Sequence, residues 1–113
     1  MPHIIIEYSE DLVPDSEIEI LVDSLHQTAI DSGLFEAANV KTRAIPVKHY
    51  RIANGEGGFI HLQCRIHVGR NDEQKKSLSH SLLDVMKQRS LNVEIITVEV
   101  VDMDKGTYAR HLA

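Results

Sequence analysis

The sequence has a single cysteine, no tryptophan and no long apolar run, and each absence excludes a class of protein. Cys64 cannot form an intramolecular disulfide, so a disulfide-stabilised secreted scaffold is excluded and a reducing cytoplasm is expected. No apolar stretch approaches the ~20 residues that span a bilayer. The first residues also lack the basic segment followed by a long apolar segment that is typical of a signal peptide. We therefore expect a cytoplasmic protein without a membrane partner.

Positive charge is scarce as well, because 12 lysines and arginines stand against 17 acidic residues and the net charge is −5. Without a basic tail or a tryptophan, the chain is not expected to bind nucleic acid. A small anionic substrate is compatible with this composition, since a few cations placed around one pocket dominate the potential there.

The seven histidines do not form a metal-binding pattern. His61 and His67 share a face of a predicted strand, but six residues separate them, which is too far for two ligands of one ion. No cysteine pair and no His-Glu-x-x-His segment accompanies them. The glycine-rich segment 54–58 lacks the Lys-Ser/Thr ending of a phosphate-binding loop. We therefore expect neither a metal nor another cofactor.

The balance of 42% apolar and 26% charged residues is typical of one globular domain, which we assign to residues 1–113. Hydrophobic periodicity and turn residues divide it into two similar strand–helix–strand units. In order, the predicted elements are a strand at 3–8, a helix that ends at Gly33, a strand at 39–51 that is interrupted or ends near Pro46, a loop at 54–58, a strand at 59–68, a helix that follows Asn71, a strand at 92–103 and a tail.

Both predicted helices carry start signals. Pro14 lies near the start of the first helix, and Asp15 or Ser16 is expected to be its N-cap. Asn71 is a good N-cap for the second helix, and Gln74 occupies the capping-box position.

This order of elements predicts an α+β fold of the type βαββαβ. A strand–helix–strand crossover is nearly always right-handed and makes its two strands parallel. Two such units form a four-stranded mixed sheet with both helices on one face. On the other face, alternate residues of the strand at 92–103 are expected to be largely apolar. A monomer should not leave such a patch in water, so we expect a symmetric oligomer across this face.

Pro2 is the most informative single residue. Removal of Met1 would leave the Pro2 nitrogen as a secondary amine directly at the start of a strand. An α-amino group titrates near ~7.7–8.0, and desolvation or a neighbouring cation lowers its pKa further. A neutral, positioned nitrogen of this kind suits a general base. With Met1 attached, the nitrogen is a tertiary amide and cannot act as a base, and Met-Pro is also a common beginning without any role.

Three cations are candidates for binding a substrate carboxylate. Lys41 and Arg43 lie two residues apart, so they share one face of a strand. Arg70 stands just before the second helix, where it and the helix amides would form a carboxylate site. Each of these cations alone would be an ordinary surface charge, and Arg51 and Arg65 are assigned to the surface.

These residues together resemble the 5-carboxymethyl-2-hydroxymuconate isomerase family of the tautomerase superfamily. The similarity spans nearly the whole chain, with a slightly shortened loop near residues 51–57, and depends on the order and spacing of several segments. They are Pro2-His3-Ile4-Ile5-Ile6-Glu7-Tyr8, Ser32-Gly33-Leu34-Phe35, Val40-Lys41-Thr42-Arg43, Ala53-Asn54-Gly55, and Phe59-Ile60-His61-Leu62 continuing to Gly69-Arg70.

The resemblance implies a homotrimer with active sites between subunits, and a 1,3-proton shift in homoprotocatechuate catabolism that needs no cofactor. Pro2 matches the family's catalytic proline, and Arg70 matches its substrate-binding arginine. The family's other arginine falls on Lys41, while Arg43 matches a second arginine nearby. Lysine is a point charge and cannot bind a carboxylate with a flat bidentate fork, so Arg43 is an alternative ligand that faces the same way.

Two other functions stay open from the sequence. The same fold would support tautomerisation of a different keto acid, or addition of water to an unsaturated acid, and Lys41 in place of arginine keeps this alternative open. A trimeric binding protein without turnover is the second alternative, which retention of Met1 would favour.

Overall fold

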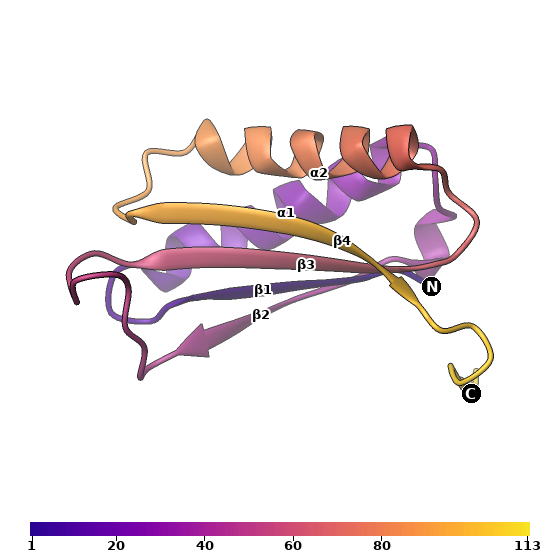
Figure 1. Cartoon of the computed structure of the whole chain (residues 1–113), viewed down its shortest axis with the longest axis horizontal. Helices are drawn as coiled ribbons and strands as arrows, with labels where there is room; N and C mark the ends of the chain where they lie inside the picture. The colour runs from indigo at the N-terminus through magenta and orange to yellow at the C-terminus, as the bar shows by residue number, and fades with distance from the viewer.

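The computed structural model describes residues 1–113 and confirms the repeated strand–helix–strand order (Figure 1). Neither α-helix is both long and apolar enough to cross a membrane. The elements are β1 (His3–Ser9), α1 (Asp15–Asp31), the 3₁₀ turn η1 (Ala37–Asn39), β2 (Lys41–Val47), β3 (Phe59–His67), α2 (Asp72–Lys87) and β4 (Ile95–Met103).

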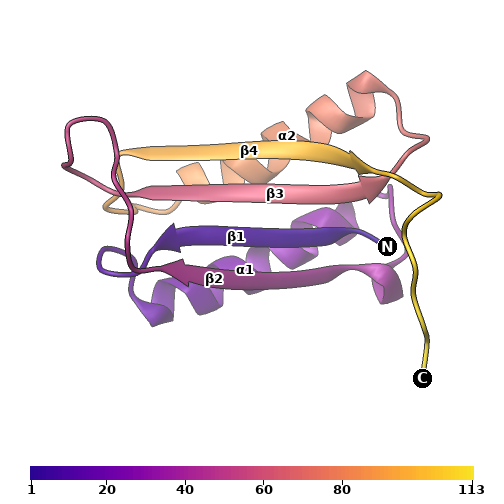
Figure 2. The ribbon, with the colours of Figure 1, turned by 60° about the horizontal axis from the view of Figure 1, so that its bottom comes forward.

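The four strands form one mixed sheet in the order β2-β1-β3-β4 (Figure 2). Each crossover makes a parallel pair, β1 with β2 and β3 with β4, and the two units meet where β1 runs antiparallel to β3. In this register His3 lies between Lys41 on β2 and Arg65 on β3. The antiparallel pairing places the beginning of β1 beside the end of β3, and this end of the sheet carries the candidate site.

Both helices cover the same face of the sheet (Figure 1). Alternate residues of β1 and β3 point into this layer, where Ile4, Ile6, Leu62 and Cys64 have no exposed surface. The helices supply matching apolar stripes at helical spacing. On α1 these are Ile18, Leu21, Leu25 and Ala29, and on α2 they are Leu78, Leu82 and Met86. Complete burial of one such aliphatic side chain contributes about 1.5–3 kcal/mol, so the two faces hold the layers together.

Two of the three predicted helix ends agree with the structure. Asn71 and Gln74 form the predicted capping box, with side-chain to backbone distances of 2.8 and 2.9 Å. Gly33 follows the end of α1 with φ of +74°, a conformation that glycine adopts at low cost. The predicted N-cap of α1 is wrong, because Asp15 already belongs to the helix and Pro14 is the N-cap without a side-chain hydrogen bond.

The sheet face that the helices leave uncovered carries both polar and apolar side chains. Its apolar residues include Ile95, Val101 and Met103 on β4, with Ile5, Ile45 and Phe59 on the other strands. Thr97 and Glu99 occupy the middle of β4 on this face. On the other side of β4, Ile96, Val98 and Val100 pack against the core beneath the helices. The other strands add polar or charged side chains, namely His3, Glu7, Lys41, Arg43, His61, Gln63 and Arg65. The expected apolar surface of β4 on this face is therefore present at the two ends of the strand and interrupted by polar residues in its middle.

Candidate active site

Pro2 lies buried at the head of β1, where the sheet holds it in place. Its carbonyl accepts a hydrogen bond from the backbone N–H of Lys41 at 3.1 Å, so the first residue of β2 fixes the chain just before β1. A pocket of about 230 Å³ opens beside it. The pocket is lined by Met1, Pro2, Leu34, Phe35, Glu36, Asn39 and Arg70.

Arg70 enters the same pocket from the loop between β3 and α2, and its guanidinium is held by neutral partners. One nitrogen, Nη2, donates to the carbonyl of Leu34 at 2.6 Å, and Nη1 donates to the carbonyl of His67 at 3.4 Å. The guanidinium carbon lies 5.1 Å from the centroid of the Phe35 ring, a cation–π distance. None of the ion pairs in the structure includes Arg70. Its charge is therefore oriented but not neutralised, as an anion site requires.

Lys41 stands at the edge of this pocket. Its Nζ lies 3.3 Å from the carbonyl of Asn39 and 3.8 Å from the sulfur of Met1, and both of these residues line the cavity. The structure thus brings together three of the predicted residues, Pro2, Arg70 and Lys41.

Electrostatics at this end of the sheet disfavour a protonated amine. Burial is the main cause that lowers the pKa of the Met1 amino group, and the charges of Lys41, Arg70 and Arg110 lower it further. The surroundings of the Met1 amino group therefore favour its neutral form.

Arg43 does not reach this pocket in the same chain. Its Nη1 donates to Nδ1 of His3 at 3.2 Å, on the open face of the sheet. Because an arginine is only a donor, His3 must accept at Nδ1 and carry its proton on Nε2, which donates to the Tyr108 hydroxyl at 2.7 Å. Arg43 and Lys41 share a face, as predicted, but Arg43 belongs to a different group of side chains.

The tail after β4, for which the sequence predicted no specific contact, packs on this end of the sheet. Tyr108 packs against His3 and also meets the ring of His67 edge-on at 4.9 Å. The tail crosses the end of the sheet near the N-terminus (Figure 2). Its charge at Arg110 also reaches the Met1 amino group.

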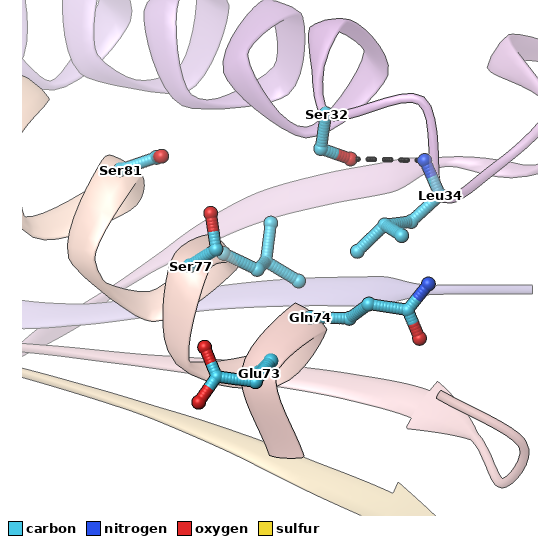
Figure 3. A pocket seen from close by; sticks show the side chains of 7 residues that line it. Ser32, Leu34, Glu73, Gln74, Ser77 and Ser81 are labelled. Carbon is cyan, nitrogen blue, oxygen red and sulfur yellow. Dashed lines mark hydrogen bonds between the residues drawn. The ribbon is translucent and has the colours of Figure 1, made fainter. Parts of the chain in front are cut away.

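A further pocket, of about 320 Å³, lies between α2 and the segment that follows α1 (Figure 3). The hydroxyl groups of Ser77 and Ser81 and the side chains of Glu73 and Gln74 line it. It contains no cationic side chain and no residue of the sheet, so it does not fit the anionic substrate that the sequence led us to expect.

A known protein family matches a part of the chain that contains the residues of this site. The family model described as 5-carboxymethyl-2-hydroxymuconate isomerase matches residues 2–98, which includes Pro2, Lys41, Arg43 and Arg70. The chain belongs to the 5-carboxymethyl-2-hydroxymuconate isomerase family. This confirms the resemblance and its place in the tautomerase superfamily.

Individual relatives agree with this family assignment. An Escherichia coli protein named 5-carboxymethyl-2-hydroxymuconate Delta-isomerase is 25% identical over 89 residues, which cover 77% of this chain and 71% of that protein. A crystal structure of a 5-carboxymethyl-2-hydroxymuconate isomerase from Deinococcus radiodurans R1 superposes with a TM-score of 0.84 at 21% identity, covering 97% of this chain and 88% of the other. A fused 4-OT symmetric trimer gives 0.75 at 18% identity, covering 91% and 86%. These two structures establish the fold.

Proposed function

We propose that this member of the isomerase family catalyses a 1,3-proton shift on an unsaturated 2-hydroxy or 2-oxo di- or tricarboxylic acid, similar to 5-carboxymethyl-2-hydroxymuconate. The observation that carries the proposal is the convergence of Pro2, Arg70 and Lys41 at one end of the sheet. A buried nitrogen stands there beside cations that have no carboxylate partner.

The nitrogen of Pro2 is the proposed general base, after removal of Met1. Burial and the same cations that lower the pKa of the Met1 amine also surround the next residue, so they would favour the neutral, basic form of a free Pro2 nitrogen. It removes the proton of the 2-hydroxyl group, which leaves a dienolate and a protonated proline. It then returns this proton to a conjugated carbon, giving the 2-oxo-enoate and the neutral base. The step consumes no cofactor.

Arg70 and Lys41 are the proposed carboxylate ligands. The pre-oriented guanidinium of Arg70 binds a substrate carboxylate and stabilises the charge of the dienolate, which is greatest in the transition state. Lys41 adds a second positive charge at the pocket edge without the bidentate geometry of an arginine. General base catalysis supplies about 10²–10⁴-fold, so binding and electrostatics must supply the remainder of the acceleration.

We also propose a homotrimer. The support is the superposition on a fused 4-OT symmetric trimer and the uncovered sheet face, which no element of this chain protects. In such an assembly, Arg43 of one subunit would be a further candidate ligand for the substrate of its neighbour.

Two measurements test the function. Intact mass of the natively expressed protein should be lower by one methionine, because only the processed chain has a basic Pro2 nitrogen. Turnover of a panel of dienols, followed by ultraviolet absorbance, should fall by at least about 10²-fold in Pro2→Ala with the fold retained. Full retention of Met1, or undiminished turnover in Pro2→Ala, would contradict the proposed base. Preference within the panel separates a muconate-type substrate from another keto acid.

A further inference from the structure

The chain segment between α1 and η1 forms one wall of the Pro2 pocket. Leu34 and Phe35 line the pocket, are half-buried and pack against the hydrophobic core. Arg70 enters from the loop between β3 and α2, so the wall and the arginine belong to different strand–helix–strand units. The position of the guanidinium therefore depends on a contact between the two units and not on its own loop alone.

This wall contacts the guanidinium of Arg70 in two ways. The carbonyl of Leu34 accepts the 2.6 Å hydrogen bond from Nη2, which fixes one edge of the group. The centroid of the Phe35 ring lies 5.1 Å from the guanidinium carbon, within the range of a cation–π interaction. The carbonyl of His67 adds a longer hydrogen bond, of 3.4 Å, from Nη1. The closest restraints on the guanidinium therefore come from Leu34 and Phe35.

Hydrogen bonds hold the wall itself at both ends. Before it, the Ser32 hydroxyl donates to the carbonyl of Ala29 at 2.6 Å and accepts from the backbone N–H of Leu34 at 3.3 Å. After it, the carbonyl of Glu36 accepts from the backbone N–H of Asn39 at 2.9 Å, within η1. The wall is thus a fixed support for the long side chain that packs on it.

These contacts orient Arg70 without cancelling its charge, because backbone carbonyls and an aromatic ring are neutral. An arginine has more N–H donors than the two hydrogen bonds use, so donors remain for a carboxylate. A guanidinium binds a carboxylate as a planar fork, and this interaction depends on its orientation. An acidic partner would also fix the side chain, but it would neutralise the charge that an anionic substrate needs.

We propose that Phe35 is a positioning residue, which holds the guanidinium of Arg70 in the orientation that binds a substrate carboxylate. The inference rests on the proposed function, in which Arg70 is the carboxylate ligand. Phe35 acts through Arg70 and needs no contact with the reacting atoms. A leucine at this position would keep apolar packing and lose the aromatic face, whereas a tyrosine would keep both.

Titration calorimetry of the native assembly with adipate tests the inference without turnover, because this saturated dicarboxylate offers carboxylates but cannot tautomerise. Phe35→Leu should weaken adipate binding by about 5-fold, through loss of the cation–π interaction and of the orientation that it provides. Phe35→Tyr should bind adipate within about 2-fold of the wild type, because its ring has the same face. The kcat/KM for a competent dienol should follow the same order, with a fall of about 5- to 10-fold in Phe35→Leu and little change in Phe35→Tyr.

A double-mutant cycle separates positioning from packing. In the Arg70→Gln background, Phe35→Leu should change adipate affinity by less than about 2-fold, because the group that Phe35 positions is absent. Val85→Ala is the control for packing, since Val85 is also half-buried against the core but lies near the far end of α2. This variant should lower stability in urea and leave adipate affinity unchanged.

The outcomes distinguish failure of this inference from failure of the proposed function. Unchanged adipate affinity and kcat/KM in Phe35→Leu, with binding lost in Arg70→Gln, would overturn the inference alone. Equal weakening by Phe35→Leu in the wild-type and Arg70→Gln backgrounds would also overturn it, because Phe35 would then act on the ligand or the fold directly. Full adipate binding in Arg70→Gln, or none in the wild type, would contradict the carboxylate role of Arg70 and the inference with it.

Discussion

Pro2 precedes β1 as Gly58 precedes β3, and the two positions have the same backbone surroundings. Both residues are buried. The carbonyl of Pro2 accepts from the backbone N–H of Lys41, the first residue of β2, and the carbonyl of Gly58 accepts from that of Ile95, the first residue of β4. The two strand–helix–strand units therefore begin with equivalent hydrogen bonding at opposite ends of the sheet.

The side chains around the two positions differ completely. Arg70 stands three residues after the end of β3, and the equivalent residue after β1 is Leu12. At the head of the paired strand, Lys41 corresponds to Ile95. A Cβ added at Gly58 would come within 2.5 Å of Cδ1 of Leu12 and 2.8 Å of Oγ of Ser9, so this end is closed by packing. One end of the repeated architecture is filled, and the other keeps a pocket with unneutralised cations.

This comparison separates what the fold provides from what the site requires. The fold provides two buried positions, each held by a parallel neighbouring strand. The site requires a cation three residues beyond the adjacent strand and a free space in place of a leucine. Substitutions at corresponding positions should therefore damage turnover at one end and stability at the other.

Arg70→Gln should produce the largest effect of these substitutions. The change removes the oriented charge beside Pro2 and leaves a shorter polar side chain, so we expect kcat/KM on a competent dienol to fall by about 10²–10³-fold. Steady-state ultraviolet assays measure this, with circular dichroism to verify the fold. Arg51→Gln is the matched control and should change kcat/KM by less than about 2-fold. A loss of the same size in both variants would remove Arg70 from the proposed mechanism.

Much of this arrangement follows from sequence pattern. Alternation in the strands, the Asn71–Gln74 capping box and Gly33 predicted the element order, because each is a local signal. The closeness of Pro2 and Arg70 follows from the antiparallel pairing of β1 with β3, because this pairing places the start of β1 beside the end of β3. Sequence patterns alone do not indicate which pocket is the candidate site, since they do not show which cation stays unpaired.

The remaining contacts have no local signal. Tyr108 and His3 are 105 residues apart, and their hydrogen bond decides where Arg43 is held. Asp15 and Ser16 were chosen as N-caps by residue type, but the helix begins one residue earlier because Pro14 can hold the extended backbone of the cap.

Gly58→Ala should produce a loss of stability at the closed end. The added methyl group has to displace Leu12 and Ser9, which are packed against the backbone there, and overpacking of this kind costs about 1–3 kcal/mol. Urea unfolding measures the change. The control is Gly106→Ala, because a Cβ at Gly106 would have only one ordinary contact, at 3.5 Å from Asp104. Equal stability of the two variants would show that the closed end is not tightly packed.

Lys41→Arg should change substrate binding to a smaller extent. An arginine at the pocket edge can bind a carboxylate through two parallel hydrogen bonds, so KM should fall by up to about 10-fold with kcat little changed. Lys41→Gln should raise KM by a similar factor, because the charge is lost. Ile95→Val, at the corresponding position of the other unit, is expected to leave KM unaltered. If Lys41→Arg instead raises KM, the point charge of lysine suits this protein's substrate and the substrate differs from a muconate.

Glu17→Gln should have the smallest effect, and it tests how the two units are joined. Glu17 in the first turn of α1 accepts hydrogen bonds at 3.0 and 2.7 Å from Nε and Nη2 of Arg89, just beyond α2. The hydrogen bond from Arg89 is the main cause that lowers the pKa of Glu17, so its stabilisation is complete above the usual carboxyl pKa and disappears as the pH falls through the lowered value. We expect a fall in melting temperature at pH 7 that is smaller than in Gly58→Ala, because an exposed pair is screened by solvent. The fall should vanish at a pH below the lowered pKa of Glu17, where the wild-type carboxyl group is protonated as well. A difference that persists at that pH would come from packing of the Glu17 side chain and not from its charge.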